Sequence, residues 1–267
     1  MRERIIASFT RDNLETATRI IVPVLSIGVS VWLGKTLMDQ MNPNAGQRKE
    51  ARKQVMKMLS DMGLKPLPKL TEYEVSIATS LVDHKTLQTT WECVGGLTDI
   101  ITDLHTSVIL PFTVAHLVPE TGLPLFRAPK GVLFHGPPGC GKTLVARAMA
   151  HAAKCTFLNL QVHSLVNMWY GETQKLANAV FSLASKLQPA IIFIDEIDSF
   201  LSERSSLDNE ATRMMKTQFM ILWDGLLSSN DRIMIVAATN RPTDLDAAIL
   251  RRLPYKVPNP SLNWPQQ

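Results

Sequence analysis

Eight consecutive residues carry the most specific chemical signal in this sequence. Together they form a complete GxxxxGK[ST] pattern, read as Gly136, Pro137, Pro138, Gly139, Cys140, Gly141, Lys142 and Thr143. An apolar stretch precedes them and a helix-forming stretch follows, so loop N–H groups and a helix N-terminus would face a bound phosphate. We therefore expect ATP to bind here, with Lys142 neutralising the β- and γ-phosphates and the Thr143 hydroxyl binding Mg²⁺.

Two adjacent carboxylates, Asp195 and Glu196, follow a buried-strand pattern further along the chain. Because this pair follows a phosphate-binding loop in the sequence, we interpret Asp195 as helping to hold Mg²⁺ and Glu196 as the base that polarises the attacking water. The simpler interpretation is a pair of solubilising charges at a strand end. Asn240, at the end of the next predicted strand, would lie between these strand ends and orient the same water.

Strand and helix patterns alternate around these residues. Four apolar runs are predicted strands, at 131–135, 156–160, 190–195 and 233–239. Apolar residues at helical spacing lie between them: Leu176, Val180, Leu183 and Leu187, then Met215, Phe219, Leu222 and Trp223. The alternation predicts an α/β fold, a P-loop NTPase parallel sheet with flanking helices.

An uncharged apolar run of fifteen residues, 20–34, lies near the N-terminus between Arg19 and Lys35. Extended to Met38, with the lysine reaching the headgroups, it is long enough to cross a thin bilayer, and we predict a transmembrane anchor at 19–38. A buried or interfacial helix and a signal peptide are the alternatives. A buried or interfacial helix is the weaker explanation because the run is apolar on all sides. A signal peptide is weaker because no small-residue cleavage site follows the run.

Residues 39–90 are predicted to form a juxtamembrane linker. Val55, Met58, Leu59 and Met62 fall at helical spacing, and Gly63 is predicted to end that helix. Seven basic residues crowd this part of the chain: Arg48, Lys49, Arg52, Lys53, Lys57, Lys65 and Lys69. They account for much of the net charge of +4, and without interleaved aromatics they favour a solvated or lipid-facing surface over nucleic-acid binding.

The composition, 45% hydrophobic and 19% charged, is typical of a globular protein. The three cysteines, Cys93, Cys140 and Cys155, have neither CxxC spacing nor an even number, which argues against disulfides and a zinc site. No HExxH motif occurs, so nothing indicates a metalloprotease.

Three segments make the chain resemble AAA ATPases of the meiotic clade: 169–172 (WYGE), 195–199 (DEIDS) and 238–242 (ATNRP). With the N-terminal apolar run and the 70–74 segment (LTEYE), the chain is similar to the AAA ATPases of the outer mitochondrial and peroxisomal membranes that extract mislocalised tail-anchored proteins. The resemblance implies a membrane-anchored hexamer whose ATPase domain faces the cytosol, at either membrane.

Further roles come from the resemblance alone. It assigns Trp169 and Tyr170 to a pore loop that grips the translocating polypeptide by contact area. It assigns Arg251 and Arg252 to arginine fingers that reach the nucleotide of a neighbouring subunit. Core aromatics and solvated surface arginines are the plainer interpretations.

Two departures from the family pattern shape the expectations. Cys93 stands where the family has aspartate, near the adenine. After 91–257, the AAA large subdomain, the tail at 258–267 contains Pro258, Pro260 and Pro265, so Pro258 should limit any strand to a short edge strand, and no helical small domain is expected. The alternatives to an extraction ATPase are therefore a truncated regulatory subunit that binds ATP without efficient turnover, within a homo-hexamer or a mixed hexamer, and a splice or gene-model form.

Overall fold

The computed structural model describes residues 45–64, 66–82, 87, 89–115, 117, 128–160, 173–201 and 210–259. The predicted N-terminal segment 1–18, the anchor at 19–38, the aromatics Trp169 and Tyr170 and the tail beyond Asn259 lie outside these residues. Among the described residues, no helix combines the length and hydropathy needed to cross a membrane. The chain divides into two compact units after Lys53, and the sheet described below belongs to the second.

A six-stranded sheet in the order β1-β3-β4-β5-β2-β6 is the centre of this unit. Every neighbouring pair is parallel except β1 with β3. The strands are β1 (Leu81–Val82), β2 (Gly131–His135), β3 (Thr156–Leu160), β4 (Ala190–Ile194), β5 (Ile233–Thr239) and β6 (Tyr255–Pro258). Because β2 to β5 are buried on both faces, they consist of nearly continuous apolar residues, as parallel strands between helices do.

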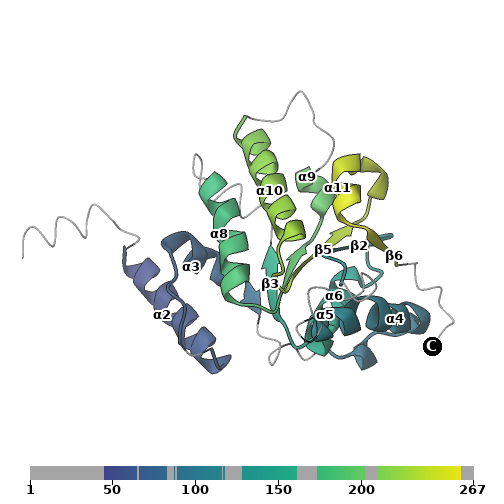
Figure 1. Cartoon of the computed structure of the whole chain (residues 1–267), viewed down its shortest axis with the longest axis horizontal. Coiled ribbons are helices and arrows are strands. Elements are labelled where there is room, and N and C mark those ends of the chain that lie inside the picture. Colours follow the sequence, from purple (N-terminus) through teal and green to yellow (C-terminus); the bar gives the residue numbers. More distant parts are fainter. Residues whose placement is uncertain are drawn as a thin grey trace, which may run out of the picture. The chain divides into compact units, whose positions relative to one another are not determined.

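Helices cover both faces of the sheet (Figure 1). One face packs on α6 (Lys142–Ala152) and on a continuous helical stretch formed by α4 (Thr98–Leu104), the π-helical turn η2 (His105–Ile109) and α5 (Leu110–Val114). The other carries α8 (Thr173–Lys186) and α10 (Glu210–Ser228). The shorter helices are α9 (Ile197–Leu201) and α11 (Ala247–Arg252), with 3₁₀ turns η1 (Trp91–Cys93) and η4 (Pro242–Asp244).

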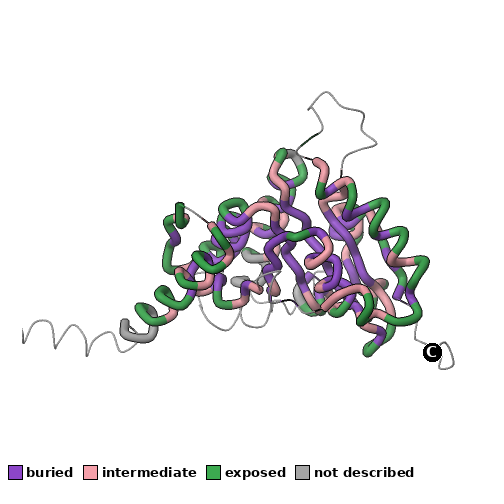
Figure 2. Tube along the Cα trace, turned by 90° about the horizontal axis from the view of Figure 1, so that it is seen from below, coloured by how far each residue is buried: buried purple, intermediate pink, exposed green. Residues whose placement is uncertain are grey.

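The buried residues concentrate along the strands and on the helix sides that face them (Figure 2). The four predicted strands are confirmed, the only difference in bounds being that β4 ends at Ile194 instead of at Asp195. The apolar stripe predicted for this segment is buried at all four positions, three of them in α8 and Leu187 just after its end. On α10, Phe219 and Trp223 are buried, and Phe219 packs against Phe181 of α8 with ring centroids 5.0 Å apart.

The predicted linker helix is α2 (Ala45–Asp61), in which Val55 and Leu59 are buried. Gly63 follows it with φ of 88°, a left-handed conformation that glycine adopts without steric cost and that ends helices. The predicted helix end is therefore confirmed.

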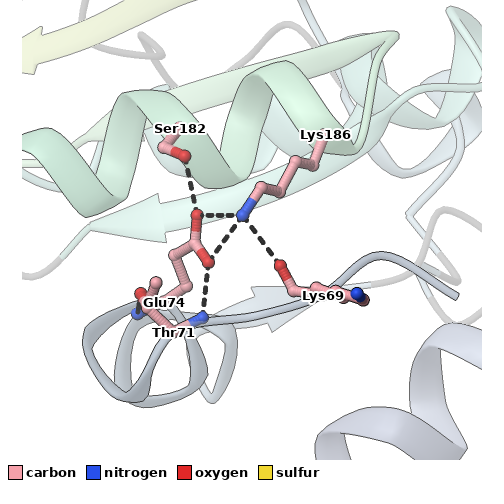
Figure 3. A network of polar contacts seen from close by, with 5 residues as sticks. All are labelled: Lys69, Thr71, Glu74, Ser182 and Lys186. Carbon is pink, nitrogen blue, oxygen red and sulfur yellow. Dashed lines mark hydrogen bonds and ion pairs between the residues drawn. The ribbon is translucent and has the colours of Figure 1, made fainter.

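Residues 72–82 belong to the α/β unit, although the sequence alone placed the start of that unit at Trp91. Here α3 (Glu72–Ala78) begins with a capping box between Thr71 and Glu74, and β1 adds an antiparallel edge strand to β3. The Glu74 carboxylate is 1% exposed and accepts hydrogen bonds from Lys186 Nζ at 2.6 and 2.8 Å, Ser182 Oγ at 2.7 Å and the Thr71 N–H at 2.7 Å (Figure 3). These contacts attach α3 to α8.

The last strand, β6, lies at the sheet edge beside β2, where Pro258 pairs with His135. Proline is tolerated at an edge because no further strand needs its missing N–H. The predicted short edge strand at Pro258 is thus confirmed.

Candidate functional site

The glycine-rich segment 136–141 joins the end of β2 to the start of α6, as the sequence predicts. Gly141 precedes the helix with φ of 82°, a left-handed conformation, so the loop turns back over the first turn of α6. Helix α6 has no acidic residue in its first turn and no side-chain cap there. Its N-terminal N–H groups therefore lie at the loop, where an anion would complement the positive end of the helix dipole.

The Lys142 side chain folds back into this loop and is 8% exposed. Its Nζ donates to the main-chain oxygens of Gly136 at 2.9 Å and Pro137 at 2.8 Å, and to Asn240 Oδ1 at 2.7 Å. A buried ammonium group needs such partners because desolvation is costly. Lys142 thus links the loop to the end of β5.

Thr143 and Asp195 are brought together across two elements. Thr143 Oγ1, in the first turn of α6, donates to Asp195 Oδ2 at 3.0 Å. A hydroxyl and a carboxylate side by side are hard oxygen ligands of the type that Mg²⁺ prefers, with room left for water and phosphate oxygens. The donor set fits a magnesium ion that Thr143 and Asp195 would hold.

Glu196 occupies an unusual backbone conformation directly after β4. Its φ is 50°, which few residues other than glycine adopt. Local hydrogen bonds hold this turn: the Glu196 N–H donates to Asp195 Oδ1 at 3.0 Å, and its carbonyl accepts from Ser199 N–H at 2.9 Å and Ser199 Oγ at 2.7 Å. Such strain is found at sites where a side chain must be aimed, and the Glu196 side chain is exposed.

Asn240 lies between the other site residues, as expected. Strand β5, which it follows, pairs with β2 on one side and β4 on the other. The carboxyl ends of these three strands place the loop, the Asp195 and Glu196 pair and Asn240 at one edge of the sheet, where α/β proteins bind ligands. Except for the arginines and the pore-loop aromatics, the predicted site residues therefore form one group.

Asn259 is a site neighbour that sequence reasoning missed. It is 1% exposed, its N–H donates to His135 O at 2.7 Å, and its Nδ2 donates to Cys140 O at 3.3 Å. The main-chain carbonyl oxygen of Asn259 lies close to Gly136, and a Cβ added to Gly136 would lie 2.1 Å from that oxygen. Asn259 lies in a proline-rich segment, 119 residues after Cys140. No local sequence pattern predicts this contact.

The positive charges of Lys142 and Lys256 act on the region around the loop, which favours an anion. Burial lowers the pKa of His135, and repulsion from Lys256 and Lys142 lowers it further. His135 is therefore neutral at physiological pH and adds no charge beside the loop. Buried Cys155 is also inert, since burial raises the pKa of its thiol to about 12.

The two arginines of α11 differ. Arg251 is exposed, whereas Arg252 forms a bidentate pair with Asp224 of α10, with Nε–Oδ1 at 2.7 Å and Nη2–Oδ2 at 2.6 Å. The hydrogen bonds that Arg252 donates to the Asp224 carboxylate raise the pKa of Arg252 and lower the pKa of Asp224. In this structure Arg252 is thus engaged within its own chain, and Arg251 is the guanidinium that faces solvent.

Comparison with known proteins bears directly on this site. Residues 132–261 match the family described as "ATPase family associated with various cellular activities (AAA)". The crystal structure of the FIGL-1 AAA domain in complex with ADP is similar, with 36% sequence identity and a TM-score of 0.62 over 73% of this chain and 63% of that one.

Curated relatives are more similar in sequence. The chain is 48% identical over 255 residues to an outer mitochondrial transmembrane helix translocase of Danio rerio and 54% identical over 237 residues to that of Homo sapiens. These alignments cover 95% and 88% of this chain but 66% and 65% of the relatives. A mitochondrial sorting homolog of Caenorhabditis elegans is 47% identical over 89% of this chain and 69% of its own length.

Proposed function

This chain belongs to the AAA ATPase family, and from that premise we propose that it is a membrane-anchored ATPase that extracts mislocalised tail-anchored proteins from the outer mitochondrial membrane. The observation that carries the ATPase part is the 3.0 Å contact of Thr143 Oγ1 with Asp195 Oδ2 beside the glycine-rich loop. The names of the relatives support the membrane and the kind of substrate.

Binding of ATP uses the loop and Lys142. The loop N–H groups and the N-terminus of α6 bind the phosphates, and Lys142 exchanges its contacts with the Gly136 and Pro137 carbonyls for phosphate oxygens. Thr143 and Asp195 hold Mg²⁺, which when bound neutralises charge on the phosphates. Because Asn240 Oδ1 accepts from Lys142 at 2.7 Å, the same exchange releases Asn240 to bind water.

Hydrolysis then depends on two side chains at neighbouring strand ends. Glu196 accepts a proton from the attacking water, and Asn240 holds that water by hydrogen bonds through its amide. Arg251 of a neighbouring subunit stabilises the charge that develops on the transferred phosphoryl group. We include Arg252 in the same role only if its pair with Asp224 opens.

Extraction requires assembly and an anchor. We propose a hexamer, of this chain or mixed with a longer relative, in which Trp169 and Tyr170 grip the substrate polypeptide in a central pore. The segment 19–38 holds the assembly in the outer mitochondrial membrane or the peroxisomal membrane, with the ATPase domain on the cytosolic side, where ATP is available. No nucleic acid takes part, since the basic residues of the linker lack the interleaved aromatics of a nucleic-acid surface.

The first experiment measures phosphate release by the purified full chain with ATP and Mg²⁺. Glu196→Gln should lower kcat roughly a hundredfold or more while ATP still binds, because general bases contribute at least that factor. Glu50→Gln, at an exposed glutamate of α2, is the matched control and should leave the rate unchanged. Equal rates for Glu196→Gln and the unaltered chain would remove Glu196 from the reaction.

A second measurement tests the substrate. The chain is reconstituted in liposomes that carry a fluorescent tail-anchored protein, and ATP-dependent release of that protein is followed. We expect release with the unaltered chain and none with Glu196→Gln. ATP binding without hydrolysis or release would replace this proposal with that of a regulatory subunit.

A further inference from the structure

Thr239, the last residue of β5, connects several parts of the site. Its side chain bonds to none of the side chains assigned to catalysis. It is 1% exposed. Its Oγ1 donates to Asp198 Oδ1 at 2.8 Å and accepts from the Arg241 N–H at 2.9 Å. Its carbonyl accepts from the Gly136 N–H at 3.4 Å.

The hydroxyl of Thr239 fixes the backbone around Asn240. Accepting from the N–H two residues ahead, it closes a side-chain turn whose central residue is Asn240. A hydroxyl has one proton and two lone pairs; here it donates its hydrogen bond to the Asp198 carboxylate, and a lone pair accepts from the Arg241 N–H. Asp198 thereby determines how the hydroxyl is oriented.

Asp198 is itself tied to Glu196. It lies two residues after Glu196, in the first turn of α9, and the turn between them is held by the bonds from Ser199 to the Glu196 carbonyl. Hydrogen bonds to a charged acceptor are stronger than those between neutral groups. A short connection therefore runs from Glu196 through Asp198 and Thr239 to Asn240.

From this connection we infer that Thr239 and Asp198 are positioning residues for hydrolysis, which hold the Asn240 amide in register with the Glu196 carboxylate. The inference rests on the proposed function, because it assigns a role in the reaction that Glu196 and Asn240 carry out. Neither side chain is among those that the proposed function assigns to the phosphates or Mg²⁺, so their loss should affect kcat and spare ATP affinity.

The test compares variants of the full chain by ATP hydrolysis, ATP affinity and thermal unfolding. Thr239→Val keeps the side-chain volume but removes both hydrogen bonds, and we expect kcat to fall about tenfold or more, with ATP affinity within about twofold. Thr239→Ser restores the hydroxyl and should recover kcat to within about threefold. Asp198→Ala should resemble Thr239→Val, and the two changes combined should cost little more than either alone, because they break one connection.

Thr243→Val is the matched control, since Thr243 in η4 also contacts an aspartate, Asp244, at 3.3 Å but is exposed. It should leave kcat unchanged. If Thr239→Val hydrolyses ATP within twofold of the unaltered chain, the inference is overturned. A parallel loss of affinity, unfolding temperature and kcat that Thr239→Ser does not restore would make the role structural and also overturn it. An unaltered chain that binds ATP without turnover would instead overturn the proposed function, and with it the inference.

Discussion

At the scale of single residues, the site is held together by polar contacts that ATP would have to rearrange. Lys142 Nζ is surrounded by three oxygen atoms of the chain itself, from Gly136, Pro137 and Asn240. These oxygens satisfy the buried ammonium group until phosphate oxygens replace them. Lys142 Nζ and Asn240 Oδ1 are 2.7 Å apart, so in the proposed function binding of phosphate by Lys142 would also free Asn240.

Replacing the two arginines of α11 should have different effects on the free energy of unfolding. Arg252→Ala removes the bidentate pair with Asp224 and should lower the free energy of unfolding by about 1 kcal/mol, a modest figure because Asp224 is exposed. Arg251→Ala should change it by less than about 0.5 kcal/mol, since the side chain is exposed. Urea unfolding of both variants measures the difference. Equal losses would contradict the assignment of Arg252 to a contact within the chain.

At the scale of elements, α3 and α8 form one packed unit through Glu74. Burial acts to raise the pKa of the Glu74 carboxyl, but hydrogen bonds from Lys186, Ser182 and the Thr71 N–H outweigh it, and the net pKa lies below the ordinary value of 4.5. A carboxyl with a lowered folded-state pKa stabilises the fold above its unfolded-state pKa, and this stabilisation is lost as the pH falls through the folded-state pKa.

Glu74→Gln should therefore destabilise the chain in a pH-dependent manner. At pH 7 the free energy of unfolding should fall by about 2 kcal/mol, because the buried Glu74 side chain loses the charge that accepts hydrogen bonds from Lys186 and Ser182. Below pH 4.5 the difference from the unaltered chain should shrink as Glu74 itself becomes protonated. Urea unfolding between pH 3 and 7 measures this, and Lys186→Gln, alone and combined with Glu74→Gln, isolates the pair. A difference that is constant with pH would show that the charge of Glu74 does not matter.

At the scale of the whole molecule, the sheet order decides what a single chain can and cannot supply to the reaction. Strands β2, β5 and β4 bring the loop, Asn240 and the carboxylates to one edge of the sheet. The exposed Arg251 lies on α11 and not at the end of one of these three strands, and in the proposed hexamer it serves a neighbour. Each complete site would then consist of residues from two chains.

A complementation experiment tests this arrangement. Arg251→Ala and Glu196→Gln should each be nearly inactive when assembled alone. In an equal mixture, a site with intact Glu196 next to a subunit with intact Arg251 should arise in about a quarter of the positions if subunits mix at random, so that hydrolysis returns to about a quarter of the unaltered rate. Light scattering confirms that the mixture is assembled. An assembled mixture without recovered hydrolysis would rule out Arg251 as the residue that acts between subunits.

The sequence by itself determined where ATP-binding chemistry lies and which segments carry it. The glycine-rich loop with its lysine and threonine is one contiguous segment and the acidic pair is another, so the spacing within each predicts phosphate and magnesium binding. The strands β2, β3, β4 and β5 follow from largely apolar runs, because burial on both faces of the sheet favours apolar residues. The roles of the individual site residues stay predictions: Lys142, Thr143, Asp195, Glu196, Asn240, Arg251, Arg252, Trp169 and Tyr170.

Only the tertiary structure decided which distant residues meet. Glu74 bonds to Lys186 across 112 residues, Asn259 packs on the loop across 119, and Thr239 bonds to Asp198 across 41. Single polar residues have no periodicity, and each of them is equally compatible with an exposed position until the chain has folded. Their partners are selected by strand order and helix packing, which bring separate segments to the same place and make burial without a hydrogen bond costly.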